Sequence, residues 1–229
     1  MKMFIFILFC TISSSALAAR IAVVYHSSYG HTEVIAKAVY KGTLEIKGTE
    51  SKLIKVNPEG KIPEEAWQIL EKSDAIIFGA PTYMGSLSGP FKMFIDTTSK
   101  IFFEQKWKNK VAGGFTNSGG LSGDKLSSIL ELVVLAGQHG MIWISPGILP
   151  ESPYAPENIN RLGSYLGVMA QSNQGAPETT TASGDIKKPQ SFMVDVLQKS
   201  QKNWLSDLMN LIIKKIKVKI VQRSYTFLV

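Results

Sequence analysis

Residues 21–32 read IAVVYHSSYGHT, and this stretch decides the fold. Its first five residues are β-branched, aromatic or small, which is typical of a strand buried on both faces. A polar loop follows directly, and from Thr32 to about residue 46 apolar residues recur at helical spacing. A buried strand that leads through a short loop into a helix predicts the first half of a parallel β-α-β unit.

The same alternation continues along the chain. Further strands are predicted at residues 53–56, 74–79, 111–115 and 141–144, with helices at 63–72, 89–103 and 124–138. An irregular, glycine-rich stretch at 147–190 precedes a last predicted helix at 190–210. Five strands separated by helices predict an α/β fold with a flavodoxin-like, doubly wound five-stranded parallel sheet.

Composition excludes several classes of protein. Of the 229 residues, 45% are hydrophobic and 19% are charged, so the chain is not of the disordered class. Its single cysteine, Cys10, excludes an intramolecular disulfide and a multi-cysteine metal site. The three histidines leave little room for a histidine metal cluster, so no metal site is predicted.

The first 18 residues have the layout of a secretory signal peptide. Lys2 precedes an apolar run that ends in the small-residue pattern Ala16-x-Ala18. On this interpretation the protein is exported or periplasmic; otherwise it is cytoplasmic. Two alternatives are a wrongly assigned start codon and an uncleaved anchor.

The positive charge is concentrated near the carboxyl terminus. The formal net charge is +7, and residues 186–229 alone contain nine Lys or Arg against two Asp or Glu. Residues 209–229 are therefore interpreted as a basic extension of a domain at 20–208. A solvated face, an exposed strand edge and a weak contact with an anionic membrane surface all remain open, and no specific nucleic acid is expected.

Three loops follow predicted strands and are expected to converge on one crevice, because carboxyl ends of parallel strands share an edge of the sheet. The loop at 26–32 places hydroxyls and backbone N–H groups at the start of a helix, which favours a phosphate. Neither a GxGxxG nor a GxxxxGK[ST] motif occurs, so a terminal monophosphate suits it better than a pyrophosphate. Taken alone, each loop is also typical of an ordinary turn.

The other two loops, at 80–90 and 116–123, combine glycines with a few large side chains that suit a flat ring. His139 either pairs with the end of its own helix or faces the crevice. Nucleophile motifs such as G-x-S-x-G and the metal motif HExxH are missing from the sequence. A crevice without a catalytic set of side chains points to a borrowed cofactor, and a monophosphate with a flat ring points to FMN.

Residues 25–33, 79–85, 89–96 and 138–141 resemble the WrbA-type NAD(P)H:quinone oxidoreductases, which are flavodoxin-like FMN proteins; the similarity covers about residues 20–205. The resemblance implies that the first loop holds the FMN phosphate through Ser27, Ser28, Tyr29, Gly30, His31 and Thr32. It implies that the ring and ribityl chain are held by Pro81, Thr82, Tyr83, Met84, Gly85, Thr116, Asn117, Ser118, Gly119 and Gly120.

The resemblance also implies a reaction. Hydride passes from NAD(P)H to FMN, and a quinone then takes the same place and accepts two electrons, which predicts ping-pong kinetics. His139 matches a histidine beside the flavin, with a hydrogen-bonding or acid role. Tyr29 matches a contact to the nicotinamide nucleotide, and Phe102 stands where the family has a tryptophan facing the quinone.

The resemblance further implies a homo-oligomer, either a dimer or a tetramer. Two alternative functions remain at this point. One is a flavodoxin-like electron carrier without direct NAD(P)H oxidation. The other is a non-catalytic flavodoxin-like binding module.

Overall fold

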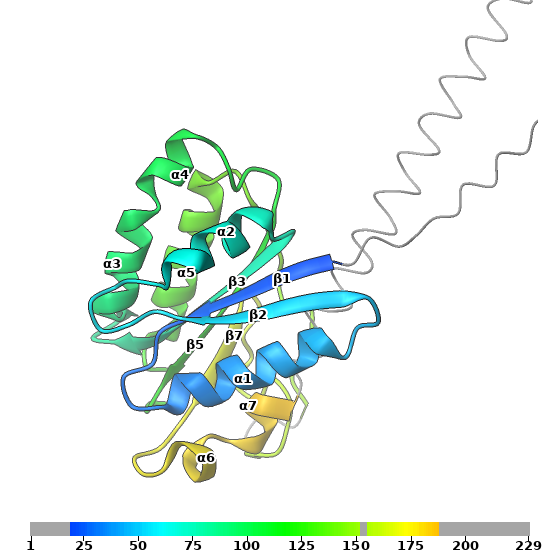
Figure 1. Ribbon diagram of the computed structural model, residues 1–229. Helices are drawn as coiled ribbons and strands as arrows, with labels where there is room; N and C mark the ends of the chain where they lie inside the picture. The colour runs from blue at the N-terminus through cyan, green and yellow to red at the C-terminus, as the bar shows by residue number, and fades with distance from the viewer. Residues whose placement is uncertain (1–18, 152–154, 188–229) are drawn as a thin grey trace, which may run out of the picture.

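Five strand positions form a parallel sheet at the centre of the computed structural model, which describes residues 19–151 and 155–187 (Figure 1). Their order is β2-β1-β3-β5-β6. The strands are β1 (Ala19–Tyr25), β2 (Thr49–Lys55), β3 (Ala75–Tyr83), β5 (Val111–Ser118) and β6 (Ile142–Trp143). The chain winds outward from β1 to β2 and then crosses to β3, so the strand order reverses between β1 and β3. This arrangement confirms the predicted flavodoxin-like α/β fold.

The edge beside β5 is shared by two short strands. β6 pairs with Val111 and Ala112 at the start of β5, whereas β7 (Val168–Gln171) pairs in parallel with its second half. The chain therefore leaves the sheet after β6 and returns to it at β7. The sequence predicted the first strand but assigned the second to an irregular stretch, because β7 depends on its neighbour more than on a local pattern.

Side chains of β1 alternate between two cores. Ala22 and Val24 face the core beneath α2, α3 and α5, whereas Ile21 and Val23 face the core beneath α1. Figure 1 shows α2 to α5 on one side of the sheet and α1, α6 and α7 on the other. These elements are α1 (His31–Leu44), α2 (Glu64–Lys72), β4 (Ser86–Leu87), α3 (Gly89–Thr97), α4 (Ser99–Phe103), α5 (Lys125–Gln138), α6 (Pro177–Thr180) and α7 (Ser183–Lys187).

The two central strands approach closely at Gly79. Its partner in register is Phe115, and a Cβ atom built on Gly79 would lie 2.0 Å from the Cζ atom of that ring. Only a glycine leaves room for the ring, which is fully buried. The ring thereby fills the core under the carboxyl ends of the strands.

Two predicted boundaries differ from the structure. The helix expected at 89–103 is divided at Thr98, whose hydroxyl donates to the carbonyl oxygen of Ile95 at 2.7 Å. The strand expected at 74–79 continues to Tyr83, because the chain pairs further with β5 and then folds back as β4. Pro81 has no N–H to donate within the sheet. Its carbonyl oxygen still takes part in the pairing, because it accepts the N–H of Ser88.

Several predictions fall outside the described residues. These are the signal-like segment at 1–18, the end of the irregular stretch after residue 187, the helix at 190–210 and the basic extension at 209–229. Within residues 19–151 and 155–187, no helix has both the length and the apolar character needed to cross a bilayer.

Candidate functional site

A cleft of about 400 Å³ opens at the carboxyl ends of the strands, a volume in the range of small-molecule and cofactor pockets. It unites the loops that follow β1, β3 and β5, as the sequence predicted. Ten of the predicted site residues line it: Ser27, Tyr29, His31, Thr32, Pro81, Thr82, Tyr83, Asn117, Ser118 and Gly119.

The loop after β1 presents the start of α1 to the cleft. Ser27 stabilises the turn by accepting the N–H of Gly30 at 3.1 Å, and Gly30 has the left-handed φ of 90°. The first N–H groups of a helix have no partner within it, and the helix dipole favours an anion at this point. The Nε2 atom of His31 is buried and has no hydrogen-bond partner among the described residues. This loop therefore leaves donors available for an anionic group.

His26 supports the same loop from below. It is buried, and its Nδ1 atom lies 2.8 Å from the hydroxyl of Ser88 at the start of α3. Burial lowers the pKa of His26, and the nearby Lys55 lowers it further. The neutral ring thus joins the loop after β1 to the segment after β4.

The loop after β3 is a tight hairpin. Tyr83 pairs with Ser86, and the two residues between them, Met84 and Gly85, both have positive φ, at 49° and 77°. The hydroxyl of Ser127 on α5 donates to the carbonyl oxygen of Gly85 and anchors the turn. The hairpin therefore presents exposed Tyr83 and Met84 at the rim of the cleft.

A second aromatic ring stands beside Tyr83. The rings of Tyr29 and Tyr83 lie 6.4 Å apart in an edge-to-face arrangement, and Tyr29 is 74% exposed. The two rings belong to different loops. The rim of the cleft therefore offers aromatic surface to a flat ligand.

Thr116 supports the cleft without lining it. Its side chain is fully buried, and its hydroxyl donates to the carbonyl oxygen of Ala80 at 2.7 Å. The hydroxyl of Thr82 lies 2.7 Å from that of Thr116 and 2.8 Å from that of Ser128. These contacts hold β3, β5 and α5 together under the cleft.

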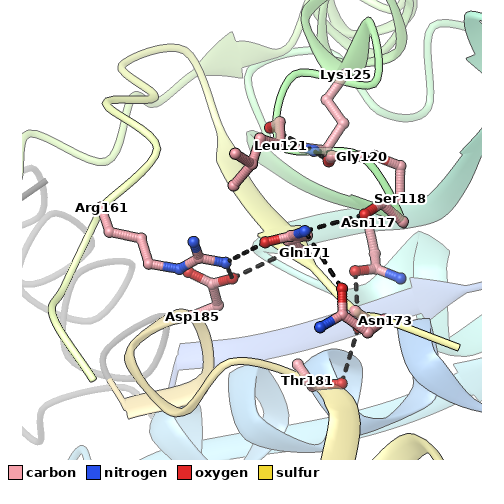
Figure 2. A network of polar contacts seen from close by, with 12 residues as sticks. Asn117, Ser118, Gly120, Leu121, Lys125, Arg161, Gln171, Asn173, Thr181 and Asp185 are labelled. Atoms are coloured by element: carbon pink, nitrogen blue, oxygen red, sulfur yellow. Dashed lines mark hydrogen bonds and ion pairs between the residues drawn. The ribbon is translucent and has the colours of Figure 1, made fainter. Parts of the chain in front are cut away.

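The loop after β5 wraps around a buried ammonium group. Lys125 donates to the hydroxyl of Ser118 at 2.9 Å and to two carbonyl oxygens, those of Gly120 and Leu121 (Figure 2). Desolvation by burial lowers the pKa of Lys125 to about 8. The sequence analysis did not identify this residue, since a lysine at the start of a helix is ordinarily a surface residue.

The segment that follows β7 adds three lining residues that sequence reasoning missed, Ser172, Asn173 and Gln174. The hydroxyl of Ser172 donates to the Oδ1 atom of Asn117 at 3.0 Å, which joins the segment after β7 to β5. Only the topology could have predicted Ser172, Asn173 and Gln174 as lining residues, because a further strand beside β5 would end at the same edge as the cleft.

The Arg161–Asp185 pair holds this additional wall. The two side chains pair at 3.2 Å and are almost completely buried. Both contact Gln171, whose side chain accepts from Arg161 and whose backbone N–H donates to Asp185. Gln171 also donates to the carbonyl oxygen of Gly119 at 3.0 Å, so the ion pair is connected to the cleft loop.

His139 and Phe102 are not brought to this cleft. His139 follows α5 and lies next to the start of β5, where its neighbour Gly140 accepts the N–H of Asn109. The cleft lies at the other end of β5, which is eight residues long, so roughly 20 Å separates them. A helix that follows a strand in a parallel sheet returns to the amino edge, and this is the physical reason.

At that amino edge His139 is packed among aromatic rings. Its ring centroid lies 4.6 Å from that of Trp107 and 6.1 Å from that of Phe102. The hydroxyl of Thr98 donates to a backbone carbonyl and therefore accepts from the Nε2 atom of His139, at 3.0 Å. Burial lowers the pKa of His139, so the ring is a neutral part of the core.

Five further predicted residues besides Thr116 do not line the cleft: Ser28, Gly30, Met84, Gly85 and Gly120. They lie in the same three loops and shape their turns. Gly30 is also constrained from outside, because a Cβ atom there would lie 2.7 Å from the Cγ atom of Pro177 on α6.

The residues present fit a flavin mononucleotide. Ser27, Thr32 and the unpartnered Nε2 atom of His31 suit a phosphate at a helix start. The amide of Asn117 and the hydroxyl of Ser118 suit the polar edge of the ring system. Among the described residues, no group of three or more His, Cys, Asp or Glu side chains is placed to hold a metal ion.

Comparisons with known proteins agree with this fit. A family model described as NADPH-dependent FMN reductase matches residues 13–152. The chain is 40% identical over 185 residues to "Flavodoxin FldP" of Pseudomonas aeruginosa, covering 80% of this chain and 97% of that protein. It is 34% identical over 173 residues to an "NAD(P)H dehydrogenase (quinone)" of Archaeoglobus fulgidus, covering 65% and 84%.

A solved structure shows the same likeness. The flavodoxin, WrbA-like protein from Agrobacterium tumefaciens superposes with a TM-score of 0.65 at 40% identity, covering 80% of this chain and 98% of that one. The resemblance to WrbA-type proteins drawn from the sequence is thus confirmed. With its fold, its cleft and these matches taken together, the chain belongs to the NADPH-dependent FMN reductase family.

Proposed function

We propose that the protein is an FMN-dependent NAD(P)H:quinone oxidoreductase. One observation carries the proposal: the loops after β1, β3 and β5 line a single cleft in a chain of this family. The relative from Archaeoglobus fulgidus that is named as an NAD(P)H dehydrogenase (quinone) supports the pair of substrates.

FMN, when bound, accepts a hydride and passes two electrons to an acceptor. The protein contributes binding and orientation. Ser27, His31 and Thr32 hold the phosphate at the start of α1. Asn117, Ser118 and the backbone at Gly119 orient the ring from the end of β5.

The rim of the cleft suits flat, uncharged substrates. Tyr29 and Tyr83 are exposed there and offer apolar faces against which a nicotinamide or a quinone ring can stack. Among the described residues, the lining contains no Asp, Glu, Lys or Arg. A neutral quinone therefore meets no charged side chain that must be desolvated.

One open place for both substrates would require the oxidised nucleotide to leave before the quinone enters, so we expect ping-pong kinetics. His139 and Phe102 can face these substrates only from a second copy of the chain, since each lies far from its own cleft. Within one chain, substrate contact is assigned to Tyr29 and its neighbours on the rim.

Steady-state kinetics of the FMN-loaded protein test the proposal. Double-reciprocal plots with NADH or NADPH and benzoquinone are expected to give parallel lines, with turnover far above that of free FMN at the same concentration. Turnover equal to the free-FMN control contradicts the proposal. Tyr29→Ala is expected to raise KM for the nucleotide about tenfold, as the loss of one aromatic contact would.

A flavodoxin-like electron carrier is the second candidate, and the match to the relative named flavodoxin favours it. The two functions differ in one measurement. Under anaerobic conditions, an oxidoreductase is bleached by a stoichiometric amount of NAD(P)H, whereas a carrier keeps its yellow absorbance until dithionite is added.

A further inference from the structure

Lys125 is a buried cation beside the cleft that the proposed function does not use. It is the first residue of α5 and is only 1% exposed. Its ammonium donates to the Oγ atom of Ser118 at 2.9 Å and to two carbonyl oxygens, at 2.6 Å for Gly120 and 2.9 Å for Leu121. Figure 2 shows the side chain directed back into its own loop. All three of its donors are therefore directed to the loop that borders the cleft.

This ammonium has no counter-charge of its own. No carboxylate in the described part of the chain forms an ion pair with it. The two charged groups that influence its pKa, Asp185 and Arg161, pair with each other at 3.2 Å. These three are the only Lys, Arg, Asp or Glu side chains buried among the described residues. With Asp185 ionised, they sum to one positive charge at the edge of the cleft.

A buried ammonium without a counter-charge is costly, and an anion in the adjacent cleft relieves that cost. FMN has two parts that carry negative charge, its phosphate and, after reduction, its ring. The phosphate belongs to the loop after β1. That loop and the loop of Lys125 flank β3, so they are two strand spacings, roughly 10 Å, apart. The phosphate is thus not the part of FMN beside Ser118, and we place the ring there.

We propose that Lys125 is a positioning residue that favours the reduced form of FMN through Ser118. Hydride transfer from NAD(P)H moves two electrons and one proton to the ring and leaves NAD(P)⁺, so the ring becomes an anion. Lys125 donates to the Oγ atom of Ser118, whose hydroxyl in turn donates to the carbonyl oxygen of Gly120 at 3.2 Å. The ammonium therefore places a fixed positive charge directly behind this lining residue of the cleft. The charge stabilises the reduced ring more than the oxidised ring. This inference rests on the proposed binding of FMN in the cleft.

The test compares Lys125→Met, which keeps much of the volume, with Lys125→Arg, which keeps the charge. Lys92→Met is the matched control, because Lys92 lies on the exposed face of α3 and pairs only with Asp96. Two quantities are measured for each: the Kd of oxidised FMN by fluorescence quenching, and the two-electron midpoint potential of bound FMN.

Lys125→Met is expected to lose at least tenfold in affinity for reduced FMN relative to oxidised FMN. For a two-electron couple that change corresponds to a midpoint potential about 30 mV more negative. Lys125→Arg is expected to stay within threefold of the wild type, and Lys92→Met to leave both quantities unchanged.

Two results overturn the inference. Equal losses for oxidised and reduced FMN mean that Lys125 only shapes the loop. A loss of affinity for FMN but not for riboflavin, with an unchanged potential, means that the charge acts on the phosphate. Wild-type protein that binds no FMN contradicts the proposed function instead, so the two failures are distinguishable.

A measurement on wild-type protein covers the case in which Lys125→Met does not fold. Burial lowers the pKa of Lys125 to about 8 in the chain without a ligand. While the bound ring is oxidised and uncharged, we expect the ammonium to start losing its proton near the same pH. Reduction then takes up one more proton, so the potential falls more steeply with pH above about 8. The facing charges, Asp185 and Arg161, remain paired over this range. An unchanged slope between pH 7 and 10 overturns the inference.

Discussion

The two ends of the sheet bury polar groups in opposite ways. At the carboxyl end, Lys125, Arg161 and Asp185 are buried as charges around an open cleft. At the amino end, neutral His139 is enclosed by Trp107 and Phe102. Charges are buried beside the cleft, whereas aromatic packing surrounds a neutral ring at the amino end of the same chain. The contrast explains why the same sheet supports chemistry at one edge and stability at the other.

The largest expected effect concerns the closed end. His139→Ala is expected to lower the free energy of unfolding by about 3 kcal/mol, because it removes a buried ring from an aromatic cluster. Urea denaturation measures the loss. Phe103→Ala, at a 79% exposed ring nearby, is the control and is expected to cost under ~0.5 kcal/mol.

The same variant tests the separation of the two ends. The Kd for FMN of His139→Ala, measured on monomeric protein, is expected to stay within twofold of the wild type. A tenfold loss of FMN affinity in the monomer would show that the two ends communicate within one chain.

The buried charge at the carboxyl end predicts that the free energy of unfolding of the protein without FMN depends on pH. The pKa of Lys125 is lowered to about 8 in the folded state against an ordinary value of 10.5. The unfolded chain therefore binds more protons between these values, and stability rises with pH from about 8 to 10.5. The gain is at most about 3 kcal/mol. Chemical denaturation across this range measures it, and Lys125→Met is expected to lack the rise.

Two glycines allow a direct comparison of the ends. Gly30 stands beside the cleft and Gly140 at the amino edge, and both have left-handed φ, at 90° and 65°. Replacing either with alanine is expected to cost about 1 kcal/mol of stability. Only Gly30→Ala is expected to weaken FMN binding, by about tenfold, because its Cβ atom would press on Pro177. Equal FMN titrations for the two variants would contradict the comparison.

The smallest expected effects belong to surface ion pairs. Glu33, near the cleft, pairs with Lys37 at 2.8 Å and Lys55 at 2.7 Å, and these contacts lower the pKa of Glu33 to about 2. Asp74 pairs with Arg20 at the amino edge. Glu33→Gln and Asp74→Asn are each expected to cost under ~1 kcal/mol at pH 7.

The effect of Glu33→Gln should also vary with pH. A carboxyl with a depressed pKa contributes its full stability above the unfolded value of 4.5, and the contribution is lost as the pH falls toward about 2. Denaturation curves of the variant and the wild type are therefore expected to converge on acidification. A constant difference from pH 7 to 3 would contradict this assignment.

The sequence predicted the sheet well because β1, β3 and β5 are continuous apolar runs that local pattern identifies. The cleft followed from topology, since the loops after these strands must meet at one edge. Residues beyond β5 were harder. Ser172 to Gln174 follow β7, a strand that forms only by pairing with β5, and Lys125 is buried only because its own loop folds over it.

The placement of His139 beside a flavin stays a prediction. Family resemblance placed it beside the flavin, whereas the path of the chain places the end of α5 at the amino edge. The winding of parallel units contains that information, so topology applied to this helix would have indicated it. Sequence resemblance relates His139 to a motif, but it does not say whether the residue faces the cleft of its own chain or the cleft of a second copy.

The division of the edge strand into β6 and β7 separates two tasks that a continuous strand would perform together. β6 pairs with the amino end of β5, whereas the residues that follow β7, Ser172 to Gln174, supply part of the cleft wall. Sequence changes between β6 and β7 can therefore move Asn173 and Gln174 without altering the aromatic packing around His139. Under the proposed function, substitutions in this one segment of the cleft wall could change which electron acceptor the protein prefers.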